Sequence, residues 1–340
     1  MKYIKLMTSL AAPPQIKAHR KTVRRQRGVA VITALLLTTL AITIVASLFW
    51  AQQVQVRSME NQRLHLQTKW ILRGALDWAG LVLRQDGRDN TYTSLDQVWA
   101  TPLAETRLDQ YIERERVEGE VFDATLSGSI IDATARYNLL NLAKNRIRDP
   151  LQVAVFQRLL TNLRLDPALA EKTATAFASA QLLLPTAEPL PEGALKPVPV
   201  QSNAAPVRLI QLDDLLAVSG YTVAVLDKLR EFVIVLPETT PVNVNTAPPE
   251  VLAAVIENFS LAEAYSLVAR RKSAPWRDAG QFRTELNGKT VAQDAVGVVS
   301  NYFLVRSRVR LDRAALDAEA LINRGTDPRK VTTLVWVRQN

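Results

Sequence analysis

The sequence predicts an α+β protein in which a long N-terminal transmembrane helix is followed by an antiparallel sheet with an inserted all-helical domain. Three observations predict this class. An uncharged run without Gly or Pro covers Val29–Trp50, extended segments occur between 117 and 141 and again after 300, and helical periodicity fills the middle. Early strands, helices and late strands in this order are typical of one α+β domain with a helical insertion.

The apolar run is a membrane span. Its 22 residues, Val29–Trp50, would reach roughly 33 Å as a helix, which matches the hydrocarbon core of a bilayer. Residues 1–28 hold eight basic residues and no acidic one, so the positive-inside rule places them in the cytoplasm and everything after Trp50 outside it.

A cleavable secretory signal is the alternative interpretation of this segment. Such signals have an apolar region of about 7 to 15 residues followed by a small-x-small cleavage site. Here the run is longer, and the best candidate site, Val45-Ala46-Ser47, lies inside it. The sequence therefore favours a retained anchor.

The predicted domains follow from changes in pattern along the chain. Residues 1–28 form a leader, 29–50 the transmembrane helix, 51–146 a helix and the first strands, 147–299 the helical insertion, and 300–340 the last strands. Six prolines between 184 and 206 predict a loop that joins two helical subdomains of the insertion. Met7 is an alternative start of the chain.

Within these domains the patterns predict individual elements. The first helix continues without Pro to Arg84, an irregular region with a short helix covers 92–110, and two strands at 121–126 and 130–137 form a hairpin around Ser127-Gly128-Ser129. Helices are expected at 151–162, 167–183, 213–217, 223–231, 249–257, 261–271 and 277–286, and strands at 301–311, 316–323 and 331–338.

Composition excludes several functions. Of 42 basic and 33 acidic residues, eight basic ones belong to the leader, which leaves 34 basic against 33 acidic residues in the rest of the chain. That part therefore has no net positive electrostatic field that would attract a polyanion such as DNA. Without cysteine there is no disulfide, thiolate zinc site or cysteine nucleophile. His19 and His65 have no partner for catalysis, and Asp213-Asp214 lies at a helix start. We expect no enzyme and no catalytic, cofactor-binding or metal-binding residue.

The junction of leader and span carries a family resemblance. Arg27-Gly28-Val29 joins a basic tail to an apolar helix, and this resembles the class III leaders of type IV pilins and pseudopilins. The resemblance implies that prepilin peptidase cuts between Gly28 and Val29, that Val29 is methylated, and that the sheet is pilin-like.

Thr33 distinguishes this chain within the group. Pilins carry a glutamate at the fifth position after the cut, which is thought to pair with the N-terminal amine of a neighbouring subunit, and this chain has Thr33 there. An unpaired carboxylate in lipid is costly. In this respect the sequence resembles the K-type minor pseudopilins of type II secretion systems, which lack the glutamate and are placed at the filament tip. The resemblance implies that Thr33 is an assembly position.

Other segments resemble the same family. They are residues 131–142, IDATARYNLLNL; residues 243–252, NVNTAPPEVL; residues 72–79, LRGALDWA; and residues 300–303, SNYF. The resemblance implies a single-pass inner-membrane protein with a periplasmic domain that joins the I- and J-type minor pseudopilins in protein secretion. The implied partners include prepilin peptidase but no nucleic acid.

One family property is missing from the sequence. K-type proteins commonly follow their first helical pair with an aspartate-rich segment that is implicated in calcium binding, whereas this chain has Ala176–Gln181 there. Calcium takes six to eight oxygen ligands, several of them carboxylates. We therefore expect no cofactor here.

Two alternative functions remain open at this stage. Residues 243–252 also resemble helix-hairpin-helix DNA-binding modules, although the turn 257–260 has no glycine to bring backbone amides close to a phosphate. Arg270, Arg271 and Lys272 form a small basic cluster nearby. The third candidate is a tip-like minor pilin of a type IV pilus.

Overall fold

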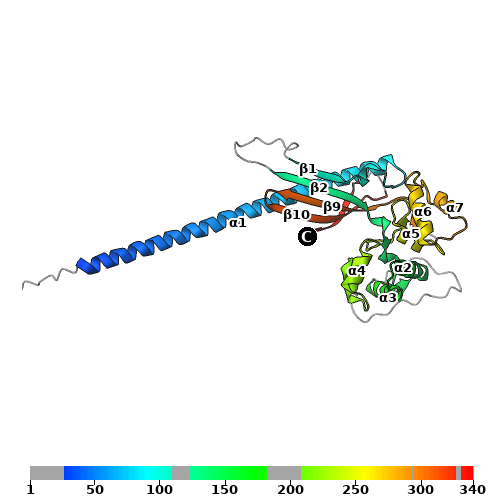
Figure 1. The fold of residues 1–340 in the computed structure, drawn as a ribbon, viewed down its shortest axis with the longest axis horizontal. Coiled ribbons are helices and arrows are strands. Elements are labelled where there is room, and N and C mark those ends of the chain that lie inside the picture. Colours follow the sequence, from blue (N-terminus) through cyan, green and yellow to red (C-terminus); the bar gives the residue numbers. More distant parts are fainter. Residues whose placement is uncertain (1–26, 109–122, 182–207, 293, 327–330, 340) are drawn as a thin grey trace, which may run out of the picture. The chain divides into compact units, whose positions relative to one another are not determined.

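The computed structural model describes residues 27–108, 123–181, 208–292, 294–326 and 331–339. The leader up to residue 26, the proline-rich loop 184–206 and His19 lie outside the described residues. The chain divides into two compact units, residues 1–62 and 63–340. The α+β class predicted from the sequence is confirmed, with a long apolar N-terminal helix, an antiparallel sheet and an inserted set of helices (Figure 1).

The first helix, α1 (Arg27–Asp89), runs through both units. It continues five residues beyond its predicted end at Arg84, and Asn90 N still donates to Asp86 O at 2.9 Å. In the second unit Leu72, Leu76 and Leu83 are buried. Their spacing of four and seven residues places them on one side of the helix, which is the side that packs on the sheet.

The sheet contains five antiparallel strands in the order β1-β2-β9-β10-β11. The strands are β1 (Leu103–Arg107), β2 (Ala124–Asp132), β9 (Tyr302–Leu311), β10 (Ala314–Asn323) and β11 (Thr333–Gln339). The three late strands confirm the expectation from the sequence. β9 and β10 are joined by a tight turn in which Asp312 takes the left-handed conformation at φ 49°, which aspartate tolerates better than most residues.

Two expectations for the early strands are wrong. The segment predicted as a hairpin is one continuous strand, β2, which pairs with β1 on one side and with β9 on the other. The region 92–110 contains β1 in addition to a short 3-10 helix, Val98–Ala100. Ser127-Gly128-Ser129 resembles a turn in composition, but Gly128 is required by the neighbouring strand: a Cβ added there would lie 2.6 Å from the carbonyl oxygen of Arg306.

Replacing Gly128 by alanine is therefore expected to destabilise the fold by about 1–3 kcal/mol, because a backbone oxygen cannot move away without disturbing the sheet. The measurement is denaturant unfolding of the detergent-solubilised chain. Gly74→Ala is the control, since in the described part of the chain nothing outside the neighbouring backbone of α1 lies within 4 Å of a Cβ built at Gly74, and a helix gains about 0.5–1 kcal/mol from this exchange. Equal stability of both variants would contradict the assignment.

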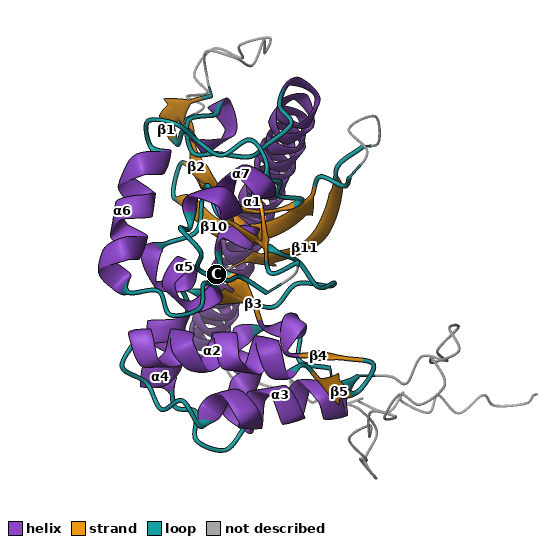
Figure 2. Ribbon diagram, turned by 90° about the vertical axis from the view of Figure 1, so that its right-hand side faces the viewer, coloured by secondary structure: helices purple, strands orange, loops and turns teal. Residues whose placement is uncertain are grey.

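The helical insertion enters between two neighbouring strands. The chain leaves the sheet at Asp132, ahead of the predicted boundary at 147, and returns at Tyr302. The helices in between are α2 (Pro150–Asn162), α3 (Leu169–Ala180), the 3-10 helix Leu212–Ala217, α4 (Val223–Leu229), α5 (Pro249–Val255), α6 (Leu261–Arg271) and α7 (Ala279–Glu285). Figures 1 and 2 both show α2, α3 and α4 as one group and α5, α6 and α7 as another.

Short pieces of secondary structure connect these groups. They are 3-10 helices Ala133–Ala135 and Leu139–Leu142 and strands β3 (Tyr137–Asn138), β4 (Ala143–Lys144), β5 (Ile147–Arg148), β6 (Val233–Ile234), β7 (Val242–Asn243) and β8 (Val296–Gly297). β3 pairs with β6, and β7 pairs with β8, both in parallel. Distant parts of the insertion are thus tied together by backbone hydrogen bonds.

Local signals explain why the helices begin where they do. Asp149 accepts hydrogen bonds from the amides of Leu151 and Gln152 before α2, and Pro150 occupies the first helical position. Ser260 and Glu263 form a reciprocal capping box at α6. These signals confirm the sequence-based helix positions to within a few residues.

Three apolar clusters form the interior. The first fills the helical insertion, with Phe156, Leu159 and Trp276 completely buried. The second lies between α1 and one face of the sheet, and the third covers part of the other face with Tyr302, Leu304 and Leu321. Alternate residues of β9 therefore contribute to different clusters, as the two-residue period of a strand requires.

Candidate functional site

The apolar part of α1 is the first candidate. Among the residues that the structure describes, α1 is the one helix long and apolar enough to cross a membrane, and its apolar segment buries no side chain within this chain. The hydroxyls of Thr38, Thr39, Thr43 and Ser47 donate to carbonyls three residues earlier in the helix, at 2.7–3.0 Å. Each polar group of this segment is satisfied inside the helix, as a bilayer requires.

Thr33 is satisfied in the same way. Its hydroxyl lies 3.0 Å from the carbonyl oxygens of both Val29 and Ala30. The side chain is exposed and carries no charge. Thr33 therefore needs no partner from another subunit, whereas a carboxylate at this position would.

The predicted processing position lies at the helix start. α1 begins at Arg27, so the Gly28–Val29 peptide bond belongs to its first turn, and Val29 is exposed. No described residue lies before Arg27. Cleavage after Gly28 and methylation of Val29 remain predictions.

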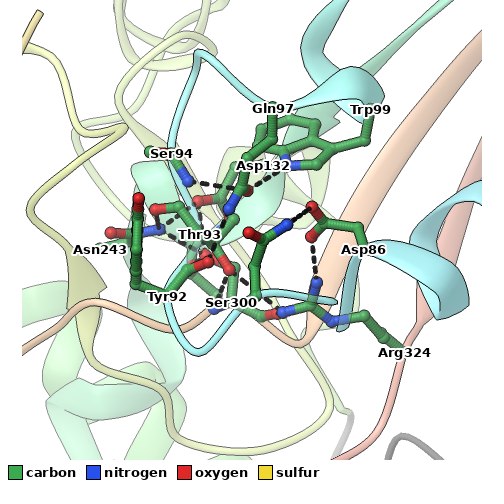
Figure 3. Close-up of polar contacts among 12 residues, drawn as sticks. Asp86, Tyr92, Thr93, Ser94, Gln97, Trp99, Asp132, Asn243, Ser300 and Arg324 are labelled. Carbon is green, nitrogen blue, oxygen red and sulfur yellow. Dashed lines mark hydrogen bonds and ion pairs between the residues drawn. The ribbon is translucent and has the colours of Figure 1, made fainter. Parts of the chain in front are cut away.

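The second candidate is a buried polar cluster around Asp132, at the end of β2 (Figure 3). One carboxylate oxygen, Oδ2, accepts hydrogen bonds from Asn243 Nδ2 at 3.0 Å, Thr246 Oγ1 at 2.5 Å and Ser300 Oγ at 2.6 Å. The other, Oδ1, accepts from the amide and the hydroxyl of Thr134, both at 2.8 Å. All five residues are buried. We call this cluster, with the residues added below, the polar junction.

The polar junction continues toward α1. Asn243 Nδ2 also donates to Thr93 O at 3.1 Å, and Ser300 N donates to Thr93 Oγ1 at 3.1 Å. Arg324, directly after β10, donates to Thr93 Oγ1 and Ser300 O and forms an ion pair with Asp86 of α1 at 2.7 Å. Figure 3 shows these side chains converging on one another from separate segments.

The ion pair in the polar junction is almost fully desolvated. The side chains of Arg324 and Asp86 are 6% and 4% exposed. Burial raises the pKa of Asp86, although Asn90 and Arg324 act in the opposite direction, and burial likewise lowers the pKa of Arg324. Breaking a buried pair leaves one charge without its partner, so each member depends strongly on the other.

The segment 242–247 connects the polar junction to the second helical group. Asn243 Oδ1 accepts from Asn245 N at 3.0 Å and closes the turn, while Asn245 bonds to the backbone of Trp276. Arg271 donates from Nη1 to the carbonyl oxygens of Val244 and Ala247 at 2.8 and 2.6 Å. Burial lowers the pKa of Arg271 to about 10.

This arrangement bears on the DNA-binding alternative. Of the basic cluster 270–272, Arg271 points inward and is buried, and Arg270 forms an ion pair with Glu285 and lies over the ring of Trp276 at 4.9 Å. The turn between α5 and α6 has Asn258, not glycine, in the left-handed conformation at φ 52°. The cluster holds the helical domain together and presents little free charge to a phosphate backbone.

The carboxylates singled out in the sequence have structural partners. Asp214 accepts from the amides of Ile210 and Gln211, and Asp213 pairs with Arg230 at 2.6 Å. His65 is exposed on α1. In the described part of the chain no three His, Asp or Glu side chains are grouped as metal ligands.

Sequence reasoning missed most of the polar junction. Asn243 and Thr246 lie in the segment 243–252 that carries the family resemblance, but nothing in that segment indicates that Thr246 reaches Asp132, 114 positions away along the chain. Asp86 and Arg324 belong to none of the motifs described from the sequence, and their pairing spans 238 positions. No local pattern marks two residues that meet only after the sheet has formed.

Comparisons with known proteins agree with this architecture. A family model described as "Type II secretion system (T2SS), protein K" matches residues 242–302, and a second model with that description matches residues 135–238. The two matches together cover most of the helical insertion. They include Asn243 and Ser300 of the polar junction.

Two relatives extend the similarity over nearly the whole chain. Type II secretion system protein K of Pseudomonas aeruginosa is 30% identical over 330 residues, which is 89% of this chain and 90% of the relative. The protein of the same name from Pectobacterium carotovorum is 26% identical over 318 residues, 88% of this chain and 93% of the relative.

A solved structure supports the fold. A chain of the crystal structure of the GspK-GspI-GspJ complex from the enterotoxigenic Escherichia coli type 2 secretion system superposes with a TM-score of 0.61 at 20% identity, and the match covers 83% of this chain and 99% of that chain. The apolar helix and the α+β domain define a single-pass inner-membrane protein with its folded part in the periplasm. The chain belongs to the type II secretion system protein K family.

Proposed function

We propose that this chain is a minor pseudopilin at the tip of the type II secretion pseudopilus, where it starts or caps the filament together with I- and J-type minor pseudopilins. The full-length similarity to protein K of Pseudomonas aeruginosa supports the place in the machine. The fold shared with a chain of the GspK-GspI-GspJ complex supports the choice of partners. Such a filament would help to export folded proteins across the outer membrane.

The main support for a position at the filament tip is the way the helical insertion is attached to the sheet. It leaves and re-enters the sheet between the adjacent strands β2 and β9. The polar junction then bonds Asn243 of the insertion to Asp132, at the end of β2, and to Ser300, shortly before β9. A bulky domain held in this way cannot swing aside, so it would hinder the addition of a further subunit above it.

Thr33 supports the same position. A subunit with a charged residue in the span needs a neighbour to neutralise that charge in lipid. The hydroxyl of Thr33 is bonded within its own helix, so this subunit can lack a neighbour on one side. Cleavage between Gly28 and Val29 by prepilin peptidase would supply the mature helix that packs against the helices of its partners.

The experiment is co-purification of the full chain from membranes with the I- and J-type pseudopilins of its own bacterium. We expect a defined complex in detergent, and loss of exoprotein secretion when the gene is deleted. A chain that purifies alone from cells containing both partners, or a deletion strain that secretes normally, would contradict the proposal. Salt-sensitive retention on duplex DNA would instead support the DNA-binding alternative.

We further propose that the chain works without catalysis and without calcium at the segment 176–181. That segment is the largely apolar end of α3 with its C-cap, Gln181. The side-chain oxygen of Gln181 accepts a hydrogen bond from Arg146 N, and its side-chain nitrogen donates to Ala143 O. The donor set contains no carboxylate, which calcium requires.

Adding EGTA is accordingly expected to leave the thermal unfolding midpoint of the detergent-solubilised chain unchanged, because no metal contributes to its folding free energy. Differential scanning fluorimetry with EGTA, and with EGTA followed by excess calcium, provides the measurement and its control. A midpoint that falls with EGTA and recovers with calcium would show a metal site that these residues do not explain.

A further inference from the structure

The two edges of the five-stranded sheet differ in how they are protected. β1 and β11 are the edge strands, and no described strand pairs with the outer side of either one (Figure 2). β1 has five residues, among them the charged Glu105 and Arg107, whereas β11 has seven, of which residues 334–337 read LVWV. Charged side chains on an edge strand oppose pairing with another chain, and a long apolar edge favours it. Both strands contain a register shift, so the edges differ in length and side chains.

β11 presents an open apolar surface together with main-chain groups. Leu334 and Val335 are 41% and 38% exposed, and Val331, just before the strand, is 70% exposed. Val335 has no Cα partner in β10, because the register shifts at this point. Alternate amide and carbonyl groups of an edge strand point away from its neighbour. β11 therefore offers donors and acceptors that no described strand uses.

A cleft lies beside β11, on the face of the sheet that α1 covers. Its volume is about 300 Å³, and its lining includes Leu76, Leu81 and Arg84 of α1 and Ile322, Val331 and Leu334. Gly80 lets α1 approach this end of β11 closely, since a Cβ built there would lie 2.6 Å from Thr332 Oγ1. A strand laid along β11 would place every second side chain on this face. The cleft is thus positioned to receive apolar side chains from such a strand.

The charges near this edge favour an acidic strand. Arg84 lines the cleft, and Asp77, which also lines it, is paired with Arg73. On the opposite face of β11, Arg338 lies over the ring of Trp336 at 4.1 Å. Opposite charges across an interface favour association and like charges oppose it. The edge therefore suits a strand that carries apolar residues and an acidic one.

An exported protein is the occupant that fits this edge best. Under the proposed function the pseudopilins meet this chain through α1, which leaves the exported protein without a contact of its own. When a strand is added to a sheet edge, main-chain hydrogen bonds give the affinity, and these bonds do not depend on the side chains of the added strand. One edge can therefore engage exported proteins whose surfaces share no sequence motif.

We infer that β11 is a docking site for exported proteins: an extended edge strand of the exported protein pairs with the outer side of β11 and places apolar side chains in the cleft beside α1. This inference rests on the proposed function, since it names the surface that would hold the protein to be exported. It assigns the free sheet edge, and not α1, to that contact.

Photo-crosslinking in the full chain tests the inference. Benzoylphenylalanine is introduced at position 335 of β11 or, as a control, at position 104, which is exposed on β1. Each chain is expressed in its own bacterium and irradiated during secretion, and the crosslinked partners are identified by mass spectrometry. We expect position 335 to capture a protein that the bacterium releases into the medium, with a yield at least about tenfold above that of position 104.

Three outcomes of the crosslinking would overturn the inference. Capture of another pseudopilin at position 335 means that β11 belongs to the contacts within the filament. Capture of a second copy of this chain means that β11 pairs with itself. Equal yields at positions 335 and 104, or no crosslink at either, mean that β11 is not a specific docking site.

Val335→Lys separates this inference from the proposed function, because a lysine on an edge strand opposes the addition of another strand. Val335 is 38% exposed, so we expect an unfolding midpoint near that of the natural chain and unchanged co-purification with the I- and J-type pseudopilins. Secretion is expected to fall at least about tenfold. Val335→Thr, which keeps a β-branched side chain without charge, and Ala104→Lys on β1 are the controls and should secrete normally.

The results for these variants distinguish two failures. If the natural chain co-purifies with the pseudopilins and Val335→Lys secretes as well as Val335→Thr, only the inference fails. If the natural chain does not co-purify with the pseudopilins, the proposed function fails.

Discussion

Replacing Arg324 by methionine is expected to destabilise the periplasmic domain by about 3–5 kcal/mol, because the change leaves the carboxylate of Asp86 buried without its counter-ion. The two side chains are 6% and 4% exposed and lie 2.7 Å apart. The same change removes the hydrogen bonds to Thr93 Oγ1 and Ser300 O. Denaturant unfolding of the detergent-solubilised chain measures the loss.

Arg308→Met is the matched control for this prediction. Arg308 pairs with Asp317 on the exposed face of the sheet, at 2.6 Å and with side chains that are 59% and 46% exposed. Exposed pairs contribute about 0–1 kcal/mol, because water screens both charges. If Arg324→Met and Arg308→Met lower the unfolding free energy by the same amount, the buried Arg324–Asp86 pair stabilises the fold no more than an exposed pair does.

The Arg324→Met variant should also acquire a pH dependence. Burial already raises the pKa of Asp86 in the folded chain, and removing Arg324 takes away one influence that lowers it. A carboxyl group whose pKa is raised by folding favours the folded state in its protonated form, so its stabilising contribution is present in acid and is lost as the pH rises through the raised pKa.

The loss of unfolding free energy caused by Arg324→Met is therefore expected to be smaller at acidic than at neutral pH. Adding Asp86→Asn to the variant should remove the dependence, since the titrating group is then absent. Unfolding free energies of the single and double variants, measured across this pH range, provide the comparison. A single variant whose deficit stays constant with pH would show that Asp86 is not the group left unpaired.

Replacing Asp132 by alanine is expected to cost about 3 kcal/mol or more, the second large effect. Asn243, Thr246 and Ser300 all donate to one oxygen of this carboxylate, and a buried donor left without an acceptor costs about 1–3 kcal/mol. Because Asn243 belongs to the insertion, we also expect faster amide hydrogen exchange at β7 and β8, which the polar junction holds in place.

The control for Asp132→Ala is Asp278→Ala. Asp278 caps α7 by accepting from Gln281 N at 2.8 Å, and losing such a cap costs typically about 1 kcal/mol. The control should leave exchange at β7 and β8 unchanged. Equal exchange there in both variants would mean that the polar junction does not fix the insertion to the sheet.

Much of the fold could be predicted from the sequence, because its determinants are local. The helices of the insertion begin at capping residues such as Asp149 and Ser260, which are recognisable from the local sequence alone. The late strands are separated by a turn at Asp312. In the same way the uncharged run Val29–Trp50 defines the membrane helix without reference to any other part of the chain.

The features that could not be predicted depend on contacts between distant segments. Gly128 was taken for part of a turn because its composition suits one, and only the neighbouring strand explains it. Asp86 and Arg324 gave no periodic signal, and their pairing appears only when α1 lies beside the end of β10. Gly28, Val29 and Thr33 raise a different difficulty, since the roles predicted for them would involve a peptidase and neighbouring subunits that act outside the fold.

On the proposed function, the apolar helix stays with the mature protein and anchors it for assembly. The most direct test is the mass of the N-terminal peptide of the chain isolated from its own bacterium. We expect a membrane-bound chain that begins at Val29, with Val29 methylated. A soluble periplasmic chain that begins at Leu48, after cleavage behind Val45-Ala46-Ser47, would contradict it.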